Sequence, residues 1–448
     1  MSLLPKYVEQ QQVDEVGGSL QLSSIFKASG RTYTLLSDTE TNKTILSGVP
    51  ARLGEEFGLQ LKAAEAVAGS PVNLDAGTRV EGYGVFTFPY GPVSFGVPEA
   101  GGFKLITYGE RIVKVIPCVN FKKRGIERLL VGWRAEDALF VIERSAGNFS
   151  ASYSTCFATA VENMLQLDVP SQAKWTRAVA IELERIYNHL YAFSRLAEAA
   201  SQNVATSQVS ALKEMVLRLN ARYFGHRFLF GLNRIGGVAY SISREQGREL
   251  EKSIRTLTRE FSEIVDYFLS SRIFLDRLQD TARLVKRDAQ KLGAVGPVAR
   301  GSDVPWDDRL MCPIEPYDDV YVNIETGVGE DTMARTMVRI QEIQSSTVVI
   351  RELLDKMPSD GATLSSQSGP KRKRYDSDDF SLCRIESPSG DLIQVVQLDE
   401  QSRVSNLHIR PASLVNWLPF AKSLENNVFT DFQFAFESFG LYYADSDR

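Results

Sequence analysis

The stretch ELERIYNH places residue types that can transfer protons or hold a ligand inside an otherwise apolar segment. Glu182, Arg185 and His189 recur at intervals of three and four residues, which puts them near one face of a helix. Glu184 and Asn188 then face another side. Polar groups at this density imply either buried groups that hydrogen-bond one another or a surface contact. Taken alone, His189 is more often a satisfied structural histidine than a ligand.

Cysteine spacing bears on metal chemistry, because thiolate metal sites usually show short paired spacings. The chain has four cysteines, each far from the next in sequence, and no CxxC pair. Its three histidines are equally scattered. We therefore expect four reduced and mostly buried thiols, the common state of free cysteine. The residues concerned are Cys118, Cys156, Cys312 and Cys383, with His189, His226 and His408.

Long helices must position the polar stretch. Residues 170–204 contain no glycine, and their only proline stands at the start, where proline is tolerated. Apolar residues recur along this run at helical intervals. Residues 207–232, 244–278 and 331–357 show further helical runs. Three long helices in succession favour a bundle core. The apolar stripe consists of Val179, Leu183, Ile186, Leu190 and Phe193.

Strand-like segments flank the helical runs. Residues 81–145 combine apolar stretches with Gly and Pro, which suits short antiparallel strands. Residues 379–410 alternate strand-like pieces with turns, and the C-terminal part is helical and then irregular. These patterns predict an α+β fold in which small antiparallel β-sheets flank a central bundle of long helices.

The first 80 residues predict a small mixed region. We expect a division into an N-terminal α/β region, residues 1–80, and a main domain, residues 81–448, with a helical core at about 151–357. The elements predicted in the first region are strands at 32–38 and 43–50 and a helix at 54–69.

Composition restricts the class of partner. The net charge of -5 argues against non-specific nucleic-acid binding, which needs a basic surface. No segment reaches the roughly 18–20 apolar residues of a membrane span. The N-terminus lacks the basic and apolar stretches of a secretion signal. We expect the chain by itself to stay in the cytoplasm, with any membrane link made through a partner.

The stretch at 182–189 resembles the ELERIxNH signature shared by large subunits of nickel-iron hydrogenases and the quinone-pocket, 49 kDa-type subunit of respiratory complex I. Further motifs agree in the same order over roughly residues 85–448, and they look closest to the membrane-bound, formate-hydrogenlyase-like branch. The resemblance implies the hydrogenase large-subunit fold. The motifs are PYGPVSFGVPEAGGF (89–103), FKKRGIER (121–128), ERSAGNFSAS (143–152), LNRIGGV (232–238), EDTMARTMVRIQEIQSS (330–346), RIESPSGDL (384–392) and IRPASLVNW (409–417).

The chain departs from this family at the metal ligands. A nickel-iron centre needs four thiolates in two CxxC pairs, because these metals prefer soft ligands. The first pair would fall at Ala146 and Phe149, and the second at Tyr442 and Asp445. Alanine and phenylalanine cannot ligate, and oxygen donors suit soft nickel chemistry poorly. We expect no nickel-iron centre in this chain and no hydrogenase activity from it alone.

The resemblance implies that both former ligand segments meet at the interface with a small iron-sulfur subunit. In one hypothesis the cavity binds a small redox acceptor such as a quinone, with Tyr442 or Tyr443 donating a hydrogen bond and Asp445 relaying protons. In the other, side chains fill a dead cavity and the subunit only scaffolds its partners and transmits conformational change. The expected pocket lining is Arg144, Asn148 and Phe149.

The resemblance also implies an assembly. The leading interpretation is a subunit of a complex I-like, energy-converting oxidoreductase on the cytoplasmic side of the cell membrane, coupling electron transfer to ion translocation. Its partners would be a small subunit with a [4Fe-4S] cluster, antiporter-like membrane subunits and hydrophilic electron-input subunits. The alternative is a non-catalytic structural or coupling subunit of the same complex. Arg124 and Glu127 would form either a proton path or partner contact, or an ion pair that fixes their loop.

Overall fold

The computed structural model describes residues 80–93, 99–358, 361, 363–365 and 380–448, together with the main chain of four strands before them. These strands are β1 (Leu20–Ala28), β2 (Arg31–Asp38), β3 (Thr44–Gly48) and β4 (Val72–Asn73). Strands β1, β2 and β3 form an antiparallel sheet, and β2 and β3 occupy the two segments predicted as strands. The helix predicted at 54–69 lies outside the described residues, and the division at residue 80 stays a prediction.

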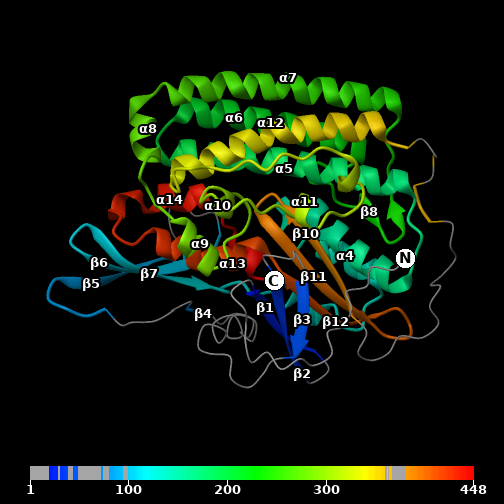
Figure 1. Cartoon of the computed structure of the whole chain (residues 1–448), viewed down its shortest axis with the longest axis horizontal. Helices are drawn as coiled ribbons and strands as arrows, with labels where there is room; N and C mark the ends of the chain where they lie inside the picture. The colour runs from blue at the N-terminus through cyan, green and yellow to red at the C-terminus, as the bar shows by residue number, and fades with distance from the viewer. Residues whose placement is uncertain are drawn as a thin grey trace.

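Four long helices form the layer at the top of Figure 1. They are α5 (Ser171–Ala199), α6 (Asn203–Phe224), α7 (Arg244–Leu269) and α12 (Thr332–Lys356). Three of them lie within the predicted helical runs, whereas α6 begins four residues before the predicted start at 207. The predicted run 244–278 is divided, because α7 ends before a second helix, α8 (Arg272–Leu278). None of the described helices is long and apolar enough to cross a membrane.

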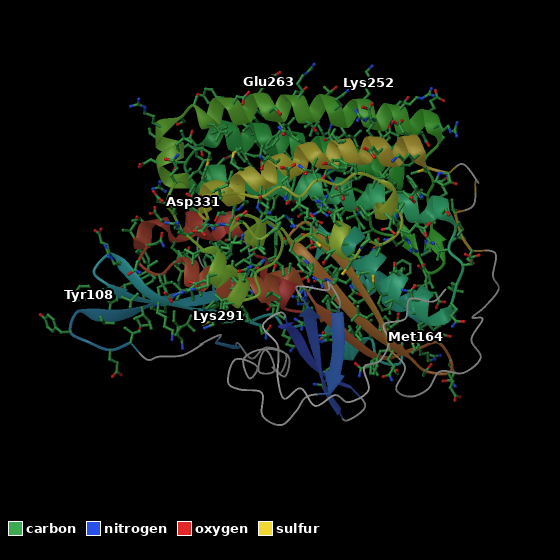
Figure 2. The ribbon with its side chains drawn as sticks, viewed as in Figure 1. Tyr108, Met164, Lys252, Glu263, Lys291 and Asp331 are labelled. Carbon is green, nitrogen blue, oxygen red and sulfur yellow. The ribbon has the colours of Figure 1, made fainter. Side chains whose placement is uncertain are left out.

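The outer helix α7 is amphipathic. Leu250, Ile254 and Phe261 are buried on its inner face. Lys252 and Glu263 point away from the body of the protein, as Figure 2 shows. Such an apolar stripe on one side of a charged helix fixes the face that packs against the bundle.

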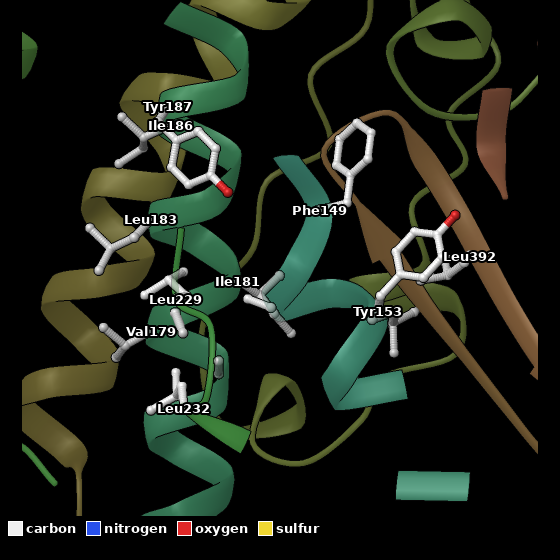
Figure 3. Close-up of a cluster of buried hydrophobic side chains, with 14 of the residues drawn as sticks. Phe149, Tyr153, Val179, Ile181, Leu183, Ile186, Tyr187, Leu229, Leu232 and Leu392 are labelled. Atoms are coloured by element: carbon white, nitrogen blue, oxygen red, sulfur yellow. The ribbon is translucent and has the colours of Figure 1, made fainter. Parts of the chain in front are cut away.

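Helix α5, by contrast, is buried on nearly all sides, because other helices cover one face and α4 (Ser150–Leu165) covers another. Figure 3 shows Leu183 and Ile186 on α5, with Phe149 and Tyr153 between this helix and Leu392. A helix enclosed in this way must satisfy its polar side chains internally. The polar stretch on α5 therefore depends on partners from other parts of the chain.

Two antiparallel sheets lie below the helical layer (Figure 1). One contains β10 (Ser381–Ser387), β11 (Gly390–Leu398) and β12 (Val404–Arg410) in that order, and α4 packs against it. The other has the order β4-β7-β6-β5. Its longer strands are β5 (Val85–Tyr90), β6 (Gly102–Tyr108) and β7 (Arg111–Val119).

The C-terminal helices close the fold against this second sheet. They are α13 (Ala412–Ser423), α14 (Phe432–Phe439) and α15 (Tyr443–Ser446). Phe103 of β6 lies at the centre of an aromatic cluster that includes Phe432 and Trp417. The α+β fold, with its long-helix bundle and small antiparallel sheets, is confirmed.

The interpretation of residues 81–145 as β-rich was wrong in its second half. This part contains α2 (Ile126–Leu129) and α3 (Ala135–Ile142). Both are short, and tertiary packing outweighs weak local signals in helices of this length. The remaining short elements are β8 (Asn233–Arg234), β9 (Gly237–Val238), α9 (Lys286–Lys291), α10 (Gly296–Arg300), α11 (Asp308–Met311) and the 3₁₀ turns Gly147–Phe149, Tyr317–Asp319 and Phe429–Asp431.

Candidate functional site

The two segments that would carry metal ligands in a nickel-iron hydrogenase lie side by side. The ring of Phe149 meets the ring of Tyr442 edge-on, with centroids 5.1 Å apart. Tyr442 also stacks on Tyr191 of α5 at 6.3 Å. Phe149 is only 2% exposed, so aromatic side chains fill the space where the two segments meet.

Asp445 is held by hydrogen bonds within the protein. Its Oδ1 accepts a 2.6 Å hydrogen bond from the hydroxyl of Tyr153, and its Oδ2 accepts one from the amide of Ser413 at 3.1 Å. The side chain is buried, and burial raises the pKa of the carboxyl above its ordinary value. Both oxygens are therefore already occupied by protein donors.

Tyr443 points into a different part of the molecule from Tyr442. Its ring lies 4.8 Å from the ring of Trp417 in the C-terminal aromatic cluster. A Cβ placed on Gly101 would come within 1.9 Å of the same ring, so Tyr443 occupies space left by a glycine. The structure therefore separates the three predicted catalytic residues, since only Tyr442 faces Phe149.

The other predicted lining residues lie at the edge of this region. The guanidinium of Arg144 lies 4.6 Å from the ring centroid of Phe230 and donates to the carbonyl of Phe140. The main-chain carbonyl of Asn148 accepts hydrogen bonds of 2.7 Å from the hydroxyl of Tyr187 and from the side chain of Asn188. These contacts orient the 3₁₀ turn that presents Phe149.

A small pocket lies beside Tyr442. Its volume of about 20 Å³ gives room for roughly one water molecule. Glu437 forms a 2.8 Å ion pair with Arg195, and Glu99 accepts the amide of Ala444 at 2.7 Å. Burial raises the pKa of both carboxyls. The lining is Glu99, Tyr191, Ala192, Arg195, Phe436, Glu437, Gly440, Leu441, Tyr442 and Tyr443.

The polar stretch on α5 belongs to a buried network of charges, which is one of the two alternatives that its spacing predicts. Glu182 contacts Arg185 at 3.4 Å and Arg309 at 3.2 Å, and it accepts from the hydroxyls of Tyr317 and Ser346. Each charge is thereby paired inside the protein, as buried charges must be.

His189 connects this network to the C-terminal segment. Its Nε2 lies 2.7 Å from Oε2 of Glu342, and its Nδ1 lies 3.3 Å from Nη1 of Arg339. Arginine only donates, so Nδ1 accepts and Nε2 carries the proton. Burial lowers the pKa of His189 to about 4, which keeps the ring neutral. Arg339 in turn donates to the carbonyl of Phe439 at 2.9 Å.

The network continues into parts of the chain that sequence reasoning missed. Arg300 lies within 2.8 Å of both Glu342 and Glu386, and Asp307 pairs with Arg309 at 2.7 Å. The motifs at 330–346 and 384–392 contain Glu342 and Glu386, but no motif includes Arg300, Asp307 or Arg309. The contacts of Arg300 with Glu342 and Glu386 span 42 and 86 residues of the chain.

Glu184 faces the other side of α5 and caps α4. It accepts hydrogen bonds from the amides of Ala151 at 2.7 Å and Ser152 at 3.1 Å, and from the Ser152 hydroxyl. Burial raises the pKa of Glu184 to about 8. The Glu184 carboxyl is thus also buried close to the 3₁₀ turn that carries Phe149.

Arg124 and Glu127 do not pair with each other. Arg124 donates to the carbonyls of Ser145 and Ala444, and Glu127 pairs with Arg448 at 3.0 Å. Arg124 therefore fixes the C-terminal segment to the loop before α2, and Glu127 fixes it to α2 itself, which differs from the local ion pair that was one of the alternatives.

A nickel-iron centre does not fit the side chains at this site. Ala146 and Phe149 have no ligating atom, and the oxygens of Asp445 are committed to Tyr153 and Ser413. Within the described part of the chain, no group of three or more His, Cys, Asp or Glu side chains is arranged to hold a metal ion.

Comparisons with known proteins agree with the fold and with the motif order. Residues 124–209 match the nickel-dependent hydrogenase family, and residues 205–379 match the family described as the respiratory-chain NADH dehydrogenase 49 Kd subunit. The chain is therefore a relative of both groups, and the resemblance drawn from its motifs is confirmed.

Two of the similar proteins are described as membrane-bound. The membrane-bound hydrogenase subunit alpha of Pyrococcus furiosus is 28% identical over 80% of this chain and 87% of its own length. Formate hydrogenlyase subunit 5 of Escherichia coli is 26% identical over 80% of this chain, which spans 62% of that protein. A chain of the archaeal membrane-bound sulfane sulfur reductase shares the fold, with a TM-score of 0.75 at 22% identity over 81% of this chain and 98% of that chain.

Proposed function

We propose that this chain is a metal-free, hydrogenase-like large subunit of a membrane-associated, complex I-like oxidoreductase, in which it has a structural and coupling function. The observation that supports this most is the contact between Phe149 and Tyr442, which lie where the family carries metal-binding thiolates. Packed aromatic rings at a former metal site prevent a void, which is what a non-catalytic descendant requires.

The buried network gives this coupling function a physical basis. His189, Arg339 and Glu342 join the long helices to the C-terminal segment, and Arg300 continues the connection to the β10–β12 sheet. A partner that binds near the C-terminal segment and one that binds near the β10–β12 sheet would thus act on the same connected set of charges. The proposed partners are a small subunit with a [4Fe-4S] cluster, antiporter-like membrane subunits and hydrophilic electron-input subunits, on the cytoplasmic side of the membrane.

A second candidate function is delivery of electrons from the iron-sulfur partner to a quinone. The pocket beside Tyr442 favours it, because a phenol and two carboxyls of raised pKa line it. A volume of about 20 Å³ holds a water molecule but no quinone headgroup. This function therefore requires Tyr442 or Tyr191 to move when the quinone binds.

Elemental analysis of the purified complex tests the metal-free state. Nickel and iron are measured by mass spectrometry and normalised to this chain. We expect no nickel, and iron only in the amount that iron-sulfur clusters of the partners account for. Stoichiometric nickel would overturn the proposal, because it would require ligands that the donor set of this chain does not supply.

The Tyr442→Phe variant of the complex separates the two functions. If the chain is a coupling subunit, the complex keeps its rate of quinone reduction, because the ring that fills the site is retained. If Tyr442 belongs to a quinone site, the substitution removes a hydrogen-bond donor, and the rate of quinone reduction falls by about a hundredfold or more. Tyr267→Phe, at an exposed position on α7, is the matched control.

A further inference from the structure

One arginine in the buried network is shared by three carboxyl groups. The guanidinium of Arg300, on α10, lies 2.7 Å from Glu342 and 2.8 Å from Glu386. Asp307 is its third neighbour, at 3.4 Å. All four side chains are at most 3% exposed. Because a buried charge needs its own compensation, one guanidinium is not enough to hold three carboxyls in the ionised form.

Two of these carboxyls are held ionised by further contacts. Asp307 pairs with Arg309 at 2.7 Å, and this pair outweighs burial and lowers the pKa of Asp307 to about 2. Glu342 accepts a hydrogen bond from His189 at 2.7 Å. Arg300 and this histidine together outweigh burial and keep the pKa of Glu342 well below its ordinary value. The third carboxyl has no comparable advantage.

Glu386 is that third carboxyl. Its Oε1 accepts from Arg300, and its Oε2 accepts a hydrogen bond from the main-chain amide of Asp308 at 3.2 Å. The nearby guanidinium of Arg185 is directed to the main-chain carbonyls of Glu386 and Ser387. The cation in contact with the Glu386 carboxyl is therefore the one that it shares with two other carboxyls.

Further negative charges surround Glu386. Asp391 lies directly opposite it in the pairing of β10 with β11, where like charges repel each other. Burial, and then repulsion from Asp307 and Asp308, raise the pKa of Glu386 to about 7, although Arg300 acts in the opposite direction. The charged groups around this carboxyl are Arg185 of α5, Arg300 of α10, Asp307 and Asp308 at the start of α11, Glu342 of α12, Arg384 of β10 and Asp391 of β11.

We propose that Glu386 is a proton-binding site of the buried network, and that its proton sets how strongly Arg300 holds β10 to the long helices. Ionised Glu386 competes with Glu342 for the guanidinium, whereas protonated Glu386 leaves Arg300 mainly to Glu342 on α12. A carboxyl has about four acceptor positions, so a proton can be bound without breaking the contact with Arg300 or Asp308. This inference concerns the network alone and does not depend on the proposed function.

Infrared spectroscopy of the full chain tests this inference, because the carbonyl stretch of an un-ionised carboxyl is separate from that of a carboxylate. Spectra are compared at about pH 5.5 and about pH 8.5, on either side of the expected transition. We expect Glu386→Gln to lack one un-ionised carboxyl per chain at the lower pH and to match the parent chain at the higher pH.

The matched control is Glu352→Gln, at the outer end of α12. Glu352 pairs with Lys356 at 3.3 Å, and a hydrogen bond from the amide of Tyr321 lowers its pKa. This carboxylate is therefore ionised at both pH values, and its removal should leave the band of un-ionised carboxyls unchanged. A band that is the same in Glu386→Gln and in the parent chain at the lower pH would overturn the inference.

Glu342→Gln tests whether the sharing of Arg300 controls the proton. The substitution removes the competing carboxylate and leaves Glu386 in place. The midpoint of the Glu386 transition should then fall by about one pH unit or more. An unchanged midpoint, or a Glu386 carboxyl that stays un-ionised at the higher pH, would contradict the proposal. A loss of stability alone does not shift this midpoint, so the measurement separates a proton-binding site from a merely structural ion pair.

Discussion

The hydroxyl of Tyr153 donates a 2.6 Å hydrogen bond to Oδ1 of Asp445, which lies 292 residues further along the chain. Because Asp445 is buried, it cannot exchange this donor for water. The bond ties α4 to α15 at the position that the motif resemblance aligns with the second pair of metal ligands. It therefore connects the N-terminal and C-terminal halves of the candidate site.

Replacing Tyr153 by phenylalanine should destabilise the protein. The change leaves a buried carboxyl with one donor fewer, at a cost of about 1–3 kcal/mol in the free energy of unfolding. Urea unfolding followed by circular dichroism measures this cost. Tyr321→Phe, at an exposed position, should change the stability by less than about 0.5 kcal/mol. Equal effects of the two variants would show that the Asp445 contact contributes nothing.

The Arg309→Met variant should be among the most damaging single changes in the chain. It leaves Glu182 and Asp307 without their shared buried partner, and such breaks cost about 3–5 kcal/mol. Thermal and urea unfolding measure the loss. The control is Arg218→Met, which breaks an exposed pair with Glu214 worth about 0–1 kcal/mol. A loss as small as that of the control would contradict the network described above.

Gly101→Ala should disturb the C-terminal aromatic cluster. The added Cβ would lie 1.9 Å from the ring of Tyr443, so the ring or the backbone must move. Overpacking of this kind typically costs about 1–3 kcal/mol. Near-ultraviolet circular dichroism should report the altered aromatic packing. Gly147→Ala is the control, because its Cβ would meet Phe230 at an ordinary 3.7 Å; an unchanged spectrum for Gly101→Ala would place Tyr443 elsewhere.

The stability of the protein should depend on pH through Glu184. Its pKa is raised to about 8 in the folded protein, against an ordinary value of 4.5. Between these values the folded state binds more protons than the unfolded state, so the free energy of unfolding falls as the pH rises. Glu184→Gln removes this titration. We expect the parent chain to lose up to a few kcal/mol relative to the variant between pH 5 and pH 8.

Parallel urea unfolding curves at pH 5, 6.5 and 8 provide the measurement. A constant difference between the parent chain and Glu184→Gln across the three values would mean that the three hydrogen bonds from α4 keep Glu184 ionised throughout. In that case burial would not be the dominant influence on this carboxyl.

The sequence by itself determined the long helices and the resemblance to the family. Helical periodicity along 170–204 and 331–357 depends on near neighbours in the chain, so α5 and α12 could be predicted without knowledge of the fold. The absence of cysteine at Ala146 and Phe149 is a matter of residue type alone. The order of the motifs along the chain, which matches that of the family, can likewise be read from residue types alone.

Only the tertiary structure decided which side chains meet. Tyr442 and Tyr443 are neighbours in sequence, yet one contacts Phe149 and the other Trp417, because successive residues point in different directions at the start of α15. His189 finds its partner Glu342 at a distance of 153 residues. Such contacts arise from packing between elements, which local sequence patterns do not encode.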